Sequence, residues 1–510
     1  MRRFSKYELN LSTSLLYKIA TCTIGILIPR LFILSYGSEI NGLQSSVAEF
    51  FTYIALIEAG VGDASVQALF GPLARKDYKT ANGILSATTF FYNRIGGIYF
   101  ILLFLLATLY PLLVEVTGLS FFTIFAYILF AGAATGLNFF FQSKVILILR
   151  ANGDTFFENL FLLISFVFSS ALKIGLILMG ESIVLIQVSY FSISLVMMVG
   201  YYFLARKRYD WINFHSIPDK EAISQKNSVI VHKISALIFN NTDIILLTFI
   251  CGLRVVSIYA MYKMVMNMVR ALIASFVDSF NYKLGQTFNN SPVTYYCKIV
   301  DSFNVCYSAF SFAMFTIASL LLLPFLRLYT DGMDMNYILP WLPYFYVTIE
   351  VLQIGRESMQ RTALVAGHFK NTLNQAIIEA AINIGVTIVA MLVCSKALDK
   401  EAGLYGALIG TICALLYRTI AINIYSNKII LKRSSFNTFK IMGVNILLYA
   451  LVCWGAVYVN WDIVDSYATL LYTAVIVALI ILPLYGIAHL ITNKSLVLPV
   501  IQFVIQRYKK

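Results

Sequence analysis

Long apolar runs separated by short polar breaks constrain this chain more than any other feature. Most of them exceed 20 residues, enough at ~1.5 Å per residue to cross a ~30 Å hydrocarbon layer. The pattern predicts an all-α, polytopic membrane protein with about fourteen transmembrane helices. The predicted spans are 12–36, 46–70, 84–110, 119–141, 156–179, 182–205, 229–250, 255–281, 299–325, 337–365, 373–395, 403–427, 440–460 and 467–490.

Composition agrees with this class and excludes others. Of 510 residues, 59% are hydrophobic and 12% are charged, against about 25% charged in soluble domains. No large soluble domain fits. The net charge of +13 indicates basic cytoplasmic loops in a membrane protein rather than binding to nucleic acid.

Neither metal nor cofactor chemistry is predicted. The seven cysteines are dispersed without a CxxC pair, and the four histidines form no HExxH motif. No GxxxxGK[ST] phosphate-binding loop is present. The apolar run from Leu11 to Leu34 is too long for the core of a signal peptide, so it is interpreted as the first membrane helix.

Loop charge predicts the orientation. If the N-terminus is cytoplasmic, most basic residues fall in inside segments, as in Arg75-Lys76-Asp77-Tyr78-Lys79. The basic residues of the outside loops are then Arg254, Arg327, Lys396 and Lys400. The positive-inside rule therefore places both termini in the cytoplasm, in a multi-pass protein of the bacterial inner membrane.

A weak internal repeat predicts the domain organisation. Lys18-Ile19-Ala20 recurs 215 positions later as Lys233-Ile234-Ser235, and several further matches have nearly the same offset. We expect an N-terminal six-helix half at 1–210, a cytoplasmic linker at 211–228 and a second six-helix half at 229–432. Two extra helices and a basic tail follow at 433–510.

Ionisable residues inside the predicted spans are the candidates for function. Charges on so many helices cannot all face lipid, so we expect two six-helix bundles around a central hydrated cavity. The basic residues within spans include Lys173, and the candidate substrate-binding cations are Arg30, Lys263, Arg270, Arg356 and Arg418. The candidate ion-coupling or cavity acids are Glu58, Asp63, Asp243 and Glu350.

Two helical faces carry several of these charges. Lys263, Asn267 and Arg270 share one face, which would suit an anionic phosphate or pyrophosphate group or would pair with acids on other helices. Glu357 and Arg361 are spaced for a local i,i+4 ion pair. Glu350 is either a proton or sodium site or the partner of a cation across the cavity.

Two stretches resemble bacterial polysaccharide flippases. The first has Gly42-Leu43-Gln44 and Ile57-Glu58-Ala59-Gly60-Val61-Gly62, then Phe70-Gly71-Pro72. The second has His232-Lys233-Ile234-Ser235 followed by Asn241-Thr242-Asp243 and Ser257-Ile258-Tyr259. The chain is therefore similar to flippases of O-antigen or capsule oligosaccharides, within the multidrug/oligosaccharidyl-lipid/polysaccharide exporter superfamily.

The resemblance implies transport rather than enzymatic catalysis. It implies that an undecaprenyl-pyrophosphate-linked oligosaccharide crosses the cytoplasmic membrane by alternating access, for surface polysaccharide synthesis. A proton or sodium gradient would supply the energy, and a polysaccharide polymerase or glycosyltransferases would be partners beside membrane lipid.

Three other functions stay open. A drug exporter of the same superfamily would be favoured by twelve helices rather than fourteen. A peptidoglycan-precursor flippase would share fourteen helices and a cationic cavity. A membrane polymerase or ligase acting on lipid-linked sugars would need a long outer loop with acidic or arginine catalytic residues. The outer loops here are short, and in the largest, at 326–336, Asp331 and Asp334 are spaced by three and form no DxD motif.

Overall fold

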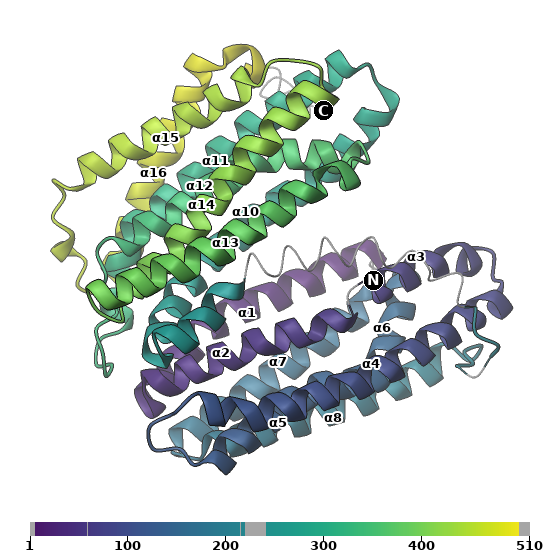
Figure 1. Cartoon of the computed structure of the whole chain (residues 1–510). Helices are drawn as coiled ribbons and strands as arrows, with labels where there is room; N and C mark the ends of the chain where they lie inside the picture. The colour runs from purple at the N-terminus through teal and green to yellow at the C-terminus, as the bar shows by residue number, and fades with distance from the viewer. Residues whose placement is uncertain (1–5, 59, 215, 220–240, 499–510) are drawn as a thin grey trace. The chain divides into compact units, whose positions relative to one another are not determined.

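The computed structural model is all-helical over the residues it describes, 6–58, 60–214, 216–219 and 241–498. The chain forms two compact units, Met1–Ser257 and Ile258–Lys510, called here the N-terminal and C-terminal units. Figure 1 shows the long helices of each unit running side by side. This confirms the predicted fold class, while the central cavity between the halves stays a prediction.

Antiparallel helices build the N-terminal unit. Their bounds are α1 Lys6–Tyr36, α2 Ser38–Ala55, η1 Leu56–Glu58, α3 Val61–Ala74, α4 Tyr78–Leu113, α5 Phe121–Phe140, α6 Gln142–Ala151, α7 Thr155–Leu178 and α8 Ile183–Arg208. A shorter helix, Asn241–Ile250, completes the described part of this unit.

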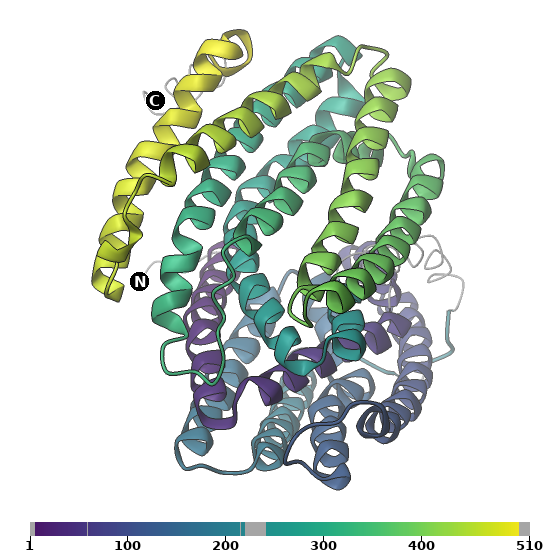
Figure 2. The same cartoon turned by 60° about the vertical axis from the view of Figure 1, so that its left-hand side comes forward.

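The next helix, α10 Leu253–Asn290, begins in the N-terminal unit and continues into the C-terminal unit. The rest of the C-terminal unit consists of α11 Val293–Tyr329, α12 Leu342–Val365, α13 Phe369–Ala397, α14 Gly403–Tyr425, η3 Ser426–Ile430, α15 Phe436–Ala456, η4 Trp461–Ile463 and α16 Tyr467–Thr492. The last two long helices, α15 and α16, pack against α11 (Figure 2).

Ten of the described helices are long and apolar enough to cross a membrane. The bent pair of α2 with α3 would be an eleventh. Two further predicted spans, 255–281 and 337–365, correspond to α10 and α12, which are long but carry the charged residues described below. The predicted span 229–250 lies partly outside the described residues. The chain is a multi-pass membrane protein.

The second membrane helix differs from the prediction. A continuous span was expected at 46–70, but the helix begins at Ser38 and changes to a 3₁₀ turn at Leu56–Glu58. It resumes at Val61 after Gly60, whose φ of 90° lies in the left-handed region that glycine adopts easily. The two parts are bent by 42°. Mean hydropathy could not show this break because Glu58, Gly60 and Asp63 lie among apolar residues.

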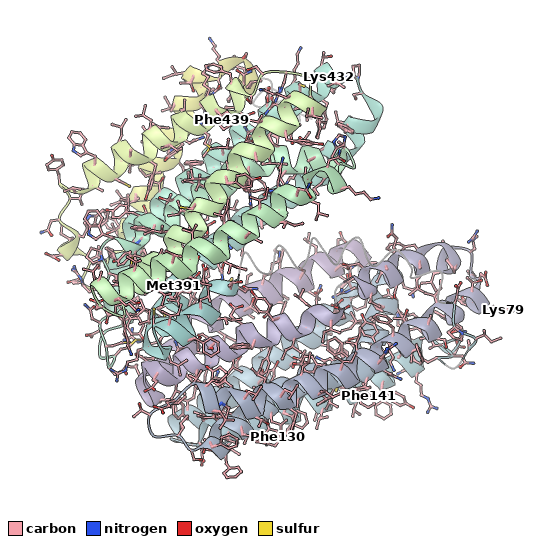
Figure 3. The ribbon with its side chains drawn as sticks, viewed as in Figure 1. Lys79, Phe130, Phe141, Met391, Lys432 and Phe439 are labelled. Atoms are coloured by element: carbon pink, nitrogen blue, oxygen red, sulfur yellow. The ribbon has the colours of Figure 1, made fainter. Side chains whose placement is uncertain are left out.

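Helix starts are fixed by polar side chains. Asp77 accepts a hydrogen bond from the Thr80 N–H at 3.1 Å and so caps α4. Ser120 caps α5 in the same way, and Ser466 forms a capping box with Thr469 at the start of α16. Lys79, labelled in Figure 3, lies in the first turn of α4, where the predicted cytoplasmic segment Arg75–Lys79 ends.

Hydrogen bonds also join α2 to the end of the N-terminal unit. The Ser46 hydroxyl accepts from Tyr110 at 3.0 Å and from Thr248 at 2.8 Å. The Asn41 amide donates to Ser257 at 2.8 Å. All of these residues are buried. The helix Asn241–Ile250 and the first turns of α10 are therefore packed with the N-terminal unit.

Candidate functional site

The predicted site residues divide between the units. Arg30, Glu58, Asp63 and Asp243 belong to the N-terminal unit. Lys263, Arg270, Glu350, Arg356 and Arg418 belong to the C-terminal unit. The part that these residues take in transport stays a prediction.

Glu58 lies at the break between α2 and α3. Its Oε1 accepts hydrogen bonds from the Tyr92 hydroxyl at 2.8 Å and from the Gly62 N–H at 3.2 Å. Tyr92 comes from α4 and is buried. The carboxylate therefore satisfies a backbone donor that the interrupted helix would leave exposed in the membrane. Asp63 follows in the first turn of α3 and is exposed.

The other candidates of the N-terminal unit lie on separate elements. Asp243 is 3% exposed on the helix Asn241–Ile250. Its neighbour Thr242 shares a 2.6 Å hydrogen bond with Tyr53 of α2. Arg30 is half-buried on α1. In this unit Glu58 and Asp63 therefore follow the end of α2, and Asp243 lies on a helix that the Thr242–Tyr53 hydrogen bond joins to α2.

Arg270 of α10, which is partly exposed, forms an ion pair with the buried Glu350 of α12. Arg270 donates from Nε at 3.3 Å and from Nη2 to the two carboxylate oxygens of Glu350, which is 2% exposed. This fork geometry is the strongest arrangement for the two groups. Lys263, on the same face of α10, lies over the Tyr259 ring at 5.8 Å. Lys263 and Arg270 therefore share one face of α10, and Arg270 is neutralised by Glu350, an acid of another helix.

Arg356 and Arg418 share one acid, Glu379. Arg356 of α12 donates through Nη1 to the carboxylate, and Arg418 of α14 has its Nε 3.5 Å from the other oxygen. Arg418 also donates to Gln375 at 2.8 Å. Glu379 comes from α13, so the cluster ties α12, α13 and α14 together. Two cations on one carboxylate leave a net positive charge inside this unit.

The predicted local pair on α12 is present. Arg361 Nη2 lies 2.5 Å from Glu357 Oε1 at i,i+4 spacing. Sequence spacing predicted this contact because both partners share a helix. The partners of Arg270, Arg356 and Arg418 come from other helices, which no spacing rule identifies.

A cavity within the N-terminal unit was not predicted. It has a volume of about 420 Å³, within the range of small-molecule sites. Its walls come from α1, α2, α5, α7 and α8. The polar lining consists of Gln44, Tyr127, Ser169, Ser170, Lys173, Gln187 and Tyr190, and Phe51 and Phe166 contribute aromatic surface.

Lys173 is the charged residue of this cavity. Its Nζ donates to Gln44 Oε1 at 3.1 Å and lies over the Phe32 ring at 4.8 Å. No described residue forms a salt bridge with it, unlike the arginines of the C-terminal unit. A lysine within a membrane helix costs about 2.5–3.5 kcal/mol on insertion scales. Its position in an apolar span is the sequence feature that could have identified Lys173 as a candidate binding residue.

Close to the other end of α7, a buried carboxylate has three partners. Asp154 is 2% exposed, and its Oδ2 accepts from Tyr209 at 2.9 Å and from Arg208 at 3.0 Å, while Oδ1 forms a salt bridge with Lys6 at 2.7 Å. Burial by itself would raise the pKa of Asp154, but these three partners outweigh it and hold that pKa below its usual value. The network joins the beginning of α1, the α6–α7 loop and the end of α8.

No group of three or more His, Cys, Asp or Glu side chains that could hold a metal ion occurs in the described part of the chain. The charged groups described above are suited to binding, ion pairing and proton exchange.

Comparisons with known proteins place the fold. No protein-family model and no curated protein matches the sequence. Among solved structures, the chain is similar to the lipid II flippase MurJ in an inward closed conformation, with a TM-score of 0.60 at 14% identity over 95% of this chain and 100% of that one.

Multidrug transporters are similar as well. An inward-facing MATE family transporter of the MOP superfamily matches with a TM-score of 0.60 at 15% identity, covering 83% of this chain and 98% of that chain. An outward-facing MATE transporter matches with a TM-score of 0.53 at 16% identity, covering 85% of this chain and 98% of that chain. At these identities the likeness shows the fold, which is that of the MOP-type transporters.

Proposed function

We propose that this protein is a flippase that moves an undecaprenyl-pyrophosphate-linked oligosaccharide from the cytoplasmic to the outer leaflet. The observation that carries the proposal is the likeness in fold to a lipid II flippase over 95% of this chain and the whole of that one. The cargo of that protein is lipid II. The polysaccharide-flippase motifs around Glu58 and Asp243 support an oligosaccharide on the lipid of the present protein.

The C-terminal helices favour this function over drug export. The alignments with the MATE structures include 98% of each MATE chain but only 83–85% of this chain. The present chain has α15 and α16 after α14, with the Arg327–Asp462 pair at 2.7 Å joining α11 to the η4 segment between them. A chain longer than the drug exporters agrees with the predicted two extra helices.

In the proposed transport mechanism, the buried charged residues bind the substrate and couple its movement to an ion gradient. Alternating access would expose a cationic surface first to one leaflet and then to the other, and Arg356 with Arg418 carries more positive charge than Glu379 neutralises. Protonation of Glu58 would weaken its acceptance of the Gly62 N–H and so loosen the break between α2 and α3. Glu58 is therefore our candidate for coupling to a proton or sodium gradient.

Deletion of the gene in its host tests the function. We expect surface polysaccharide to disappear while undecaprenyl-linked oligosaccharide accumulates on the cytoplasmic leaflet. Wild-type protein should restore both, and Glu58→Gln should not, at equal abundance in the membrane. Glu115→Gln, which changes an exposed carboxylate between α4 and α5, is the matched control and should restore both.

Other outcomes identify the alternatives. Oligosaccharide that reaches the outer leaflet but stays unpolymerised would indicate a polymerase or ligase. Unchanged polysaccharide with increased sensitivity to drugs would indicate a drug exporter. Arrest of cell-wall synthesis with accumulated peptidoglycan precursor would indicate a precursor flippase.

A further inference from the structure

The cavity around Lys173 combines one charge with many neutral hydrogen-bonding groups. Gln44 and Gln187 bring amides, and Ser169 and Ser170 bring hydroxyls. Tyr127 and Tyr190 bring phenolic hydroxyls on aromatic rings. This mixture suits a ligand with several hydroxyl groups, since apolar walls with a few polar groups fix the orientation of a small molecule.

The position of the Lys173 ammonium argues against a purely structural role. Lys173 lies five residues before the last residue of α7, which is roughly 7.5 Å along the helix axis. A lysine so near a helix end can extend toward the membrane surface. Here Nζ instead lies inside the unit, between Gln44 Oε1 and the Phe32 ring. The ammonium thus keeps donor capacity beyond its single bond to Gln44.

The charge count selects the kind of anion. A pyrophosphate is bound in proteins by several cations or by forked arginine contacts. Lys173 is the one cation among the described residues that line this cavity. A single ammonium surrounded by amides and hydroxyls matches a group with one negative charge. Among the parts of a lipid-linked oligosaccharide, a carboxylate-bearing sugar has this chemistry.

We propose that the cavity binds an acidic sugar of the transported oligosaccharide, with its carboxylate on Lys173 and its hydroxyls on the glutamines and serines. The inference rests on the proposed function and names the substrate class more closely. It also assigns a side of the membrane. Lys173 of α7 and the lining residues of α8 lie toward the helix ends that the loop charges predict to face outward, whereas Phe166 lies at the middle of α7. The sugar is therefore held between the middle of the membrane and its outer leaflet.

Binding to the purified full-length protein in detergent tests the cavity directly. The probes are methyl glucuronide, which carries the carboxylate, and methyl glucoside, which is its neutral counterpart. We expect wild-type protein to bind the glucuronide about tenfold more tightly than the glucoside, which is the effect of one charge-assisted hydrogen bond. Inorganic pyrophosphate should not displace the glucuronide.

Three variants locate the effect. Lys173→Met should remove the preference for the glucuronide and leave binding of the glucoside unchanged. Lys173→Arg should keep most of the preference, since it keeps the charge. Lys18→Met changes an exposed lysine of α1 and should behave as wild type. Equal binding of both sugars by wild-type protein, or a preference that persists in Lys173→Met, would overturn the assignment, as would displacement by pyrophosphate.

Transport measured beside binding separates the two proposals. In liposomes with lipid-linked oligosaccharides that differ only in one carboxylate, Lys173→Met should slow translocation of the acidic compound and spare the neutral one. Discrimination in binding without any translocation would overturn the flippase function and leave the cavity assigned. Translocation without discrimination in binding would overturn the assignment of the cavity and leave the flippase function standing.

Discussion

The helix pair α7–α8 of the N-terminal unit and the pair α13–α14 of the C-terminal unit lie 215 positions apart in the predicted repeat. The second pair packs very closely. A Cβ on Gly406 would lie 2.5 Å from the Met391 backbone nitrogen, and one on Gly410 would lie 2.6 Å from the Thr387 Cα. Met391 lies on α13 (Figure 3). Small residues thus allow α14 to approach the α13 backbone.

The first pair has large residues at the matching positions. Phe191 and Leu195 of α8 stand where α14 has Gly406 and Gly410. Both α7 and α8 line the cavity that contains Lys173. In the C-terminal unit, by contrast, Glu379 of α13 binds arginines of α12 and α14. The same pair of helices is thus closely packed around glycines in one unit and lines the cavity that contains Lys173 in the other.

Removing the shared acid should have the largest effect. Glu379→Gln removes the carboxylate that Arg356 and Arg418 share in the protein interior. Breaking a buried ion pair by removing one partner costs about 3–5 kcal/mol. We expect a loss of that size in the free energy of unfolding, measured by denaturation in detergent. An unchanged stability would show that the C-terminal unit does not depend on this cluster.

Widening the close helix pair should have the next largest effect. Gly410→Leu introduces the residue found at the matching position of α8, where its Cβ would lie 2.0 Å from Thr387 Oγ1. We expect a destabilisation of about 1–3 kcal/mol in the same measurement. Gly385→Leu on α13 is the control, because a Cβ there meets nothing within 4 Å. Equal effects of the two substitutions would contradict the close packing.

Asp154→Asn should have a smaller effect that depends on pH. Two partners of Asp154, Lys6 and Arg208, are largely or partly exposed, so solvent screening limits the loss to about 1 kcal/mol. Because the pKa of Asp154 is below its usual value, its carboxylate stabilises the fold above the unfolded pKa, about 3.9. That contribution disappears as the pH falls through the folded pKa.

Thermal unfolding measured across pH tests this contribution. Between pH 5 and 8 the difference in unfolding temperature between wild type and Asp154→Asn should be constant. Below about pH 4 this difference should become smaller. A gap that widens in acid would mean that the carboxylate is not stabilised by its partners.

Lys173→Met should have the smallest effect on stability. The substitution removes a cation that no described carboxylate neutralises and keeps most of its apolar stem. We expect the free energy of unfolding to stay within about 0.5 kcal/mol of wild type, or to rise. A loss as large as that of Glu379→Gln would make Lys173 a structural residue and erase the contrast between the units.

The prediction from sequence was most accurate where hydropathy decides. Spans 156–179 and 467–490 match α7 and α16 to within two residues because polar residues bound their apolar runs. It was less accurate where helices extend beyond the membrane-length run, as in α10 and α11, and at the break after Glu58. The short helix α6 lies where a loop was expected, since hydropathy identifies spans and not helices outside them.

The candidate site was predictable only in part. The pair Glu357–Arg361 follows from spacing on one helix. The Glu379 cluster needs three helices, and the cavity at Lys173 needs five, so neither can be found before the helices are packed. Lys173 itself was visible as a cation in an apolar span, but its importance depends on Gln44, Phe32 and the space beside them.

Translocation by the purified protein tests the central proposal most directly. The full-length chain is reconstituted into liposomes with an undecaprenyl-pyrophosphate-linked oligosaccharide that carries a fluorophore on its sugar, and a membrane-impermeant quencher is added. If the protein is a flippase, the fraction protected in the inner leaflet will fall steadily toward zero. If protection stays as in protein-free liposomes while the protein remains folded, the proposed function is wrong.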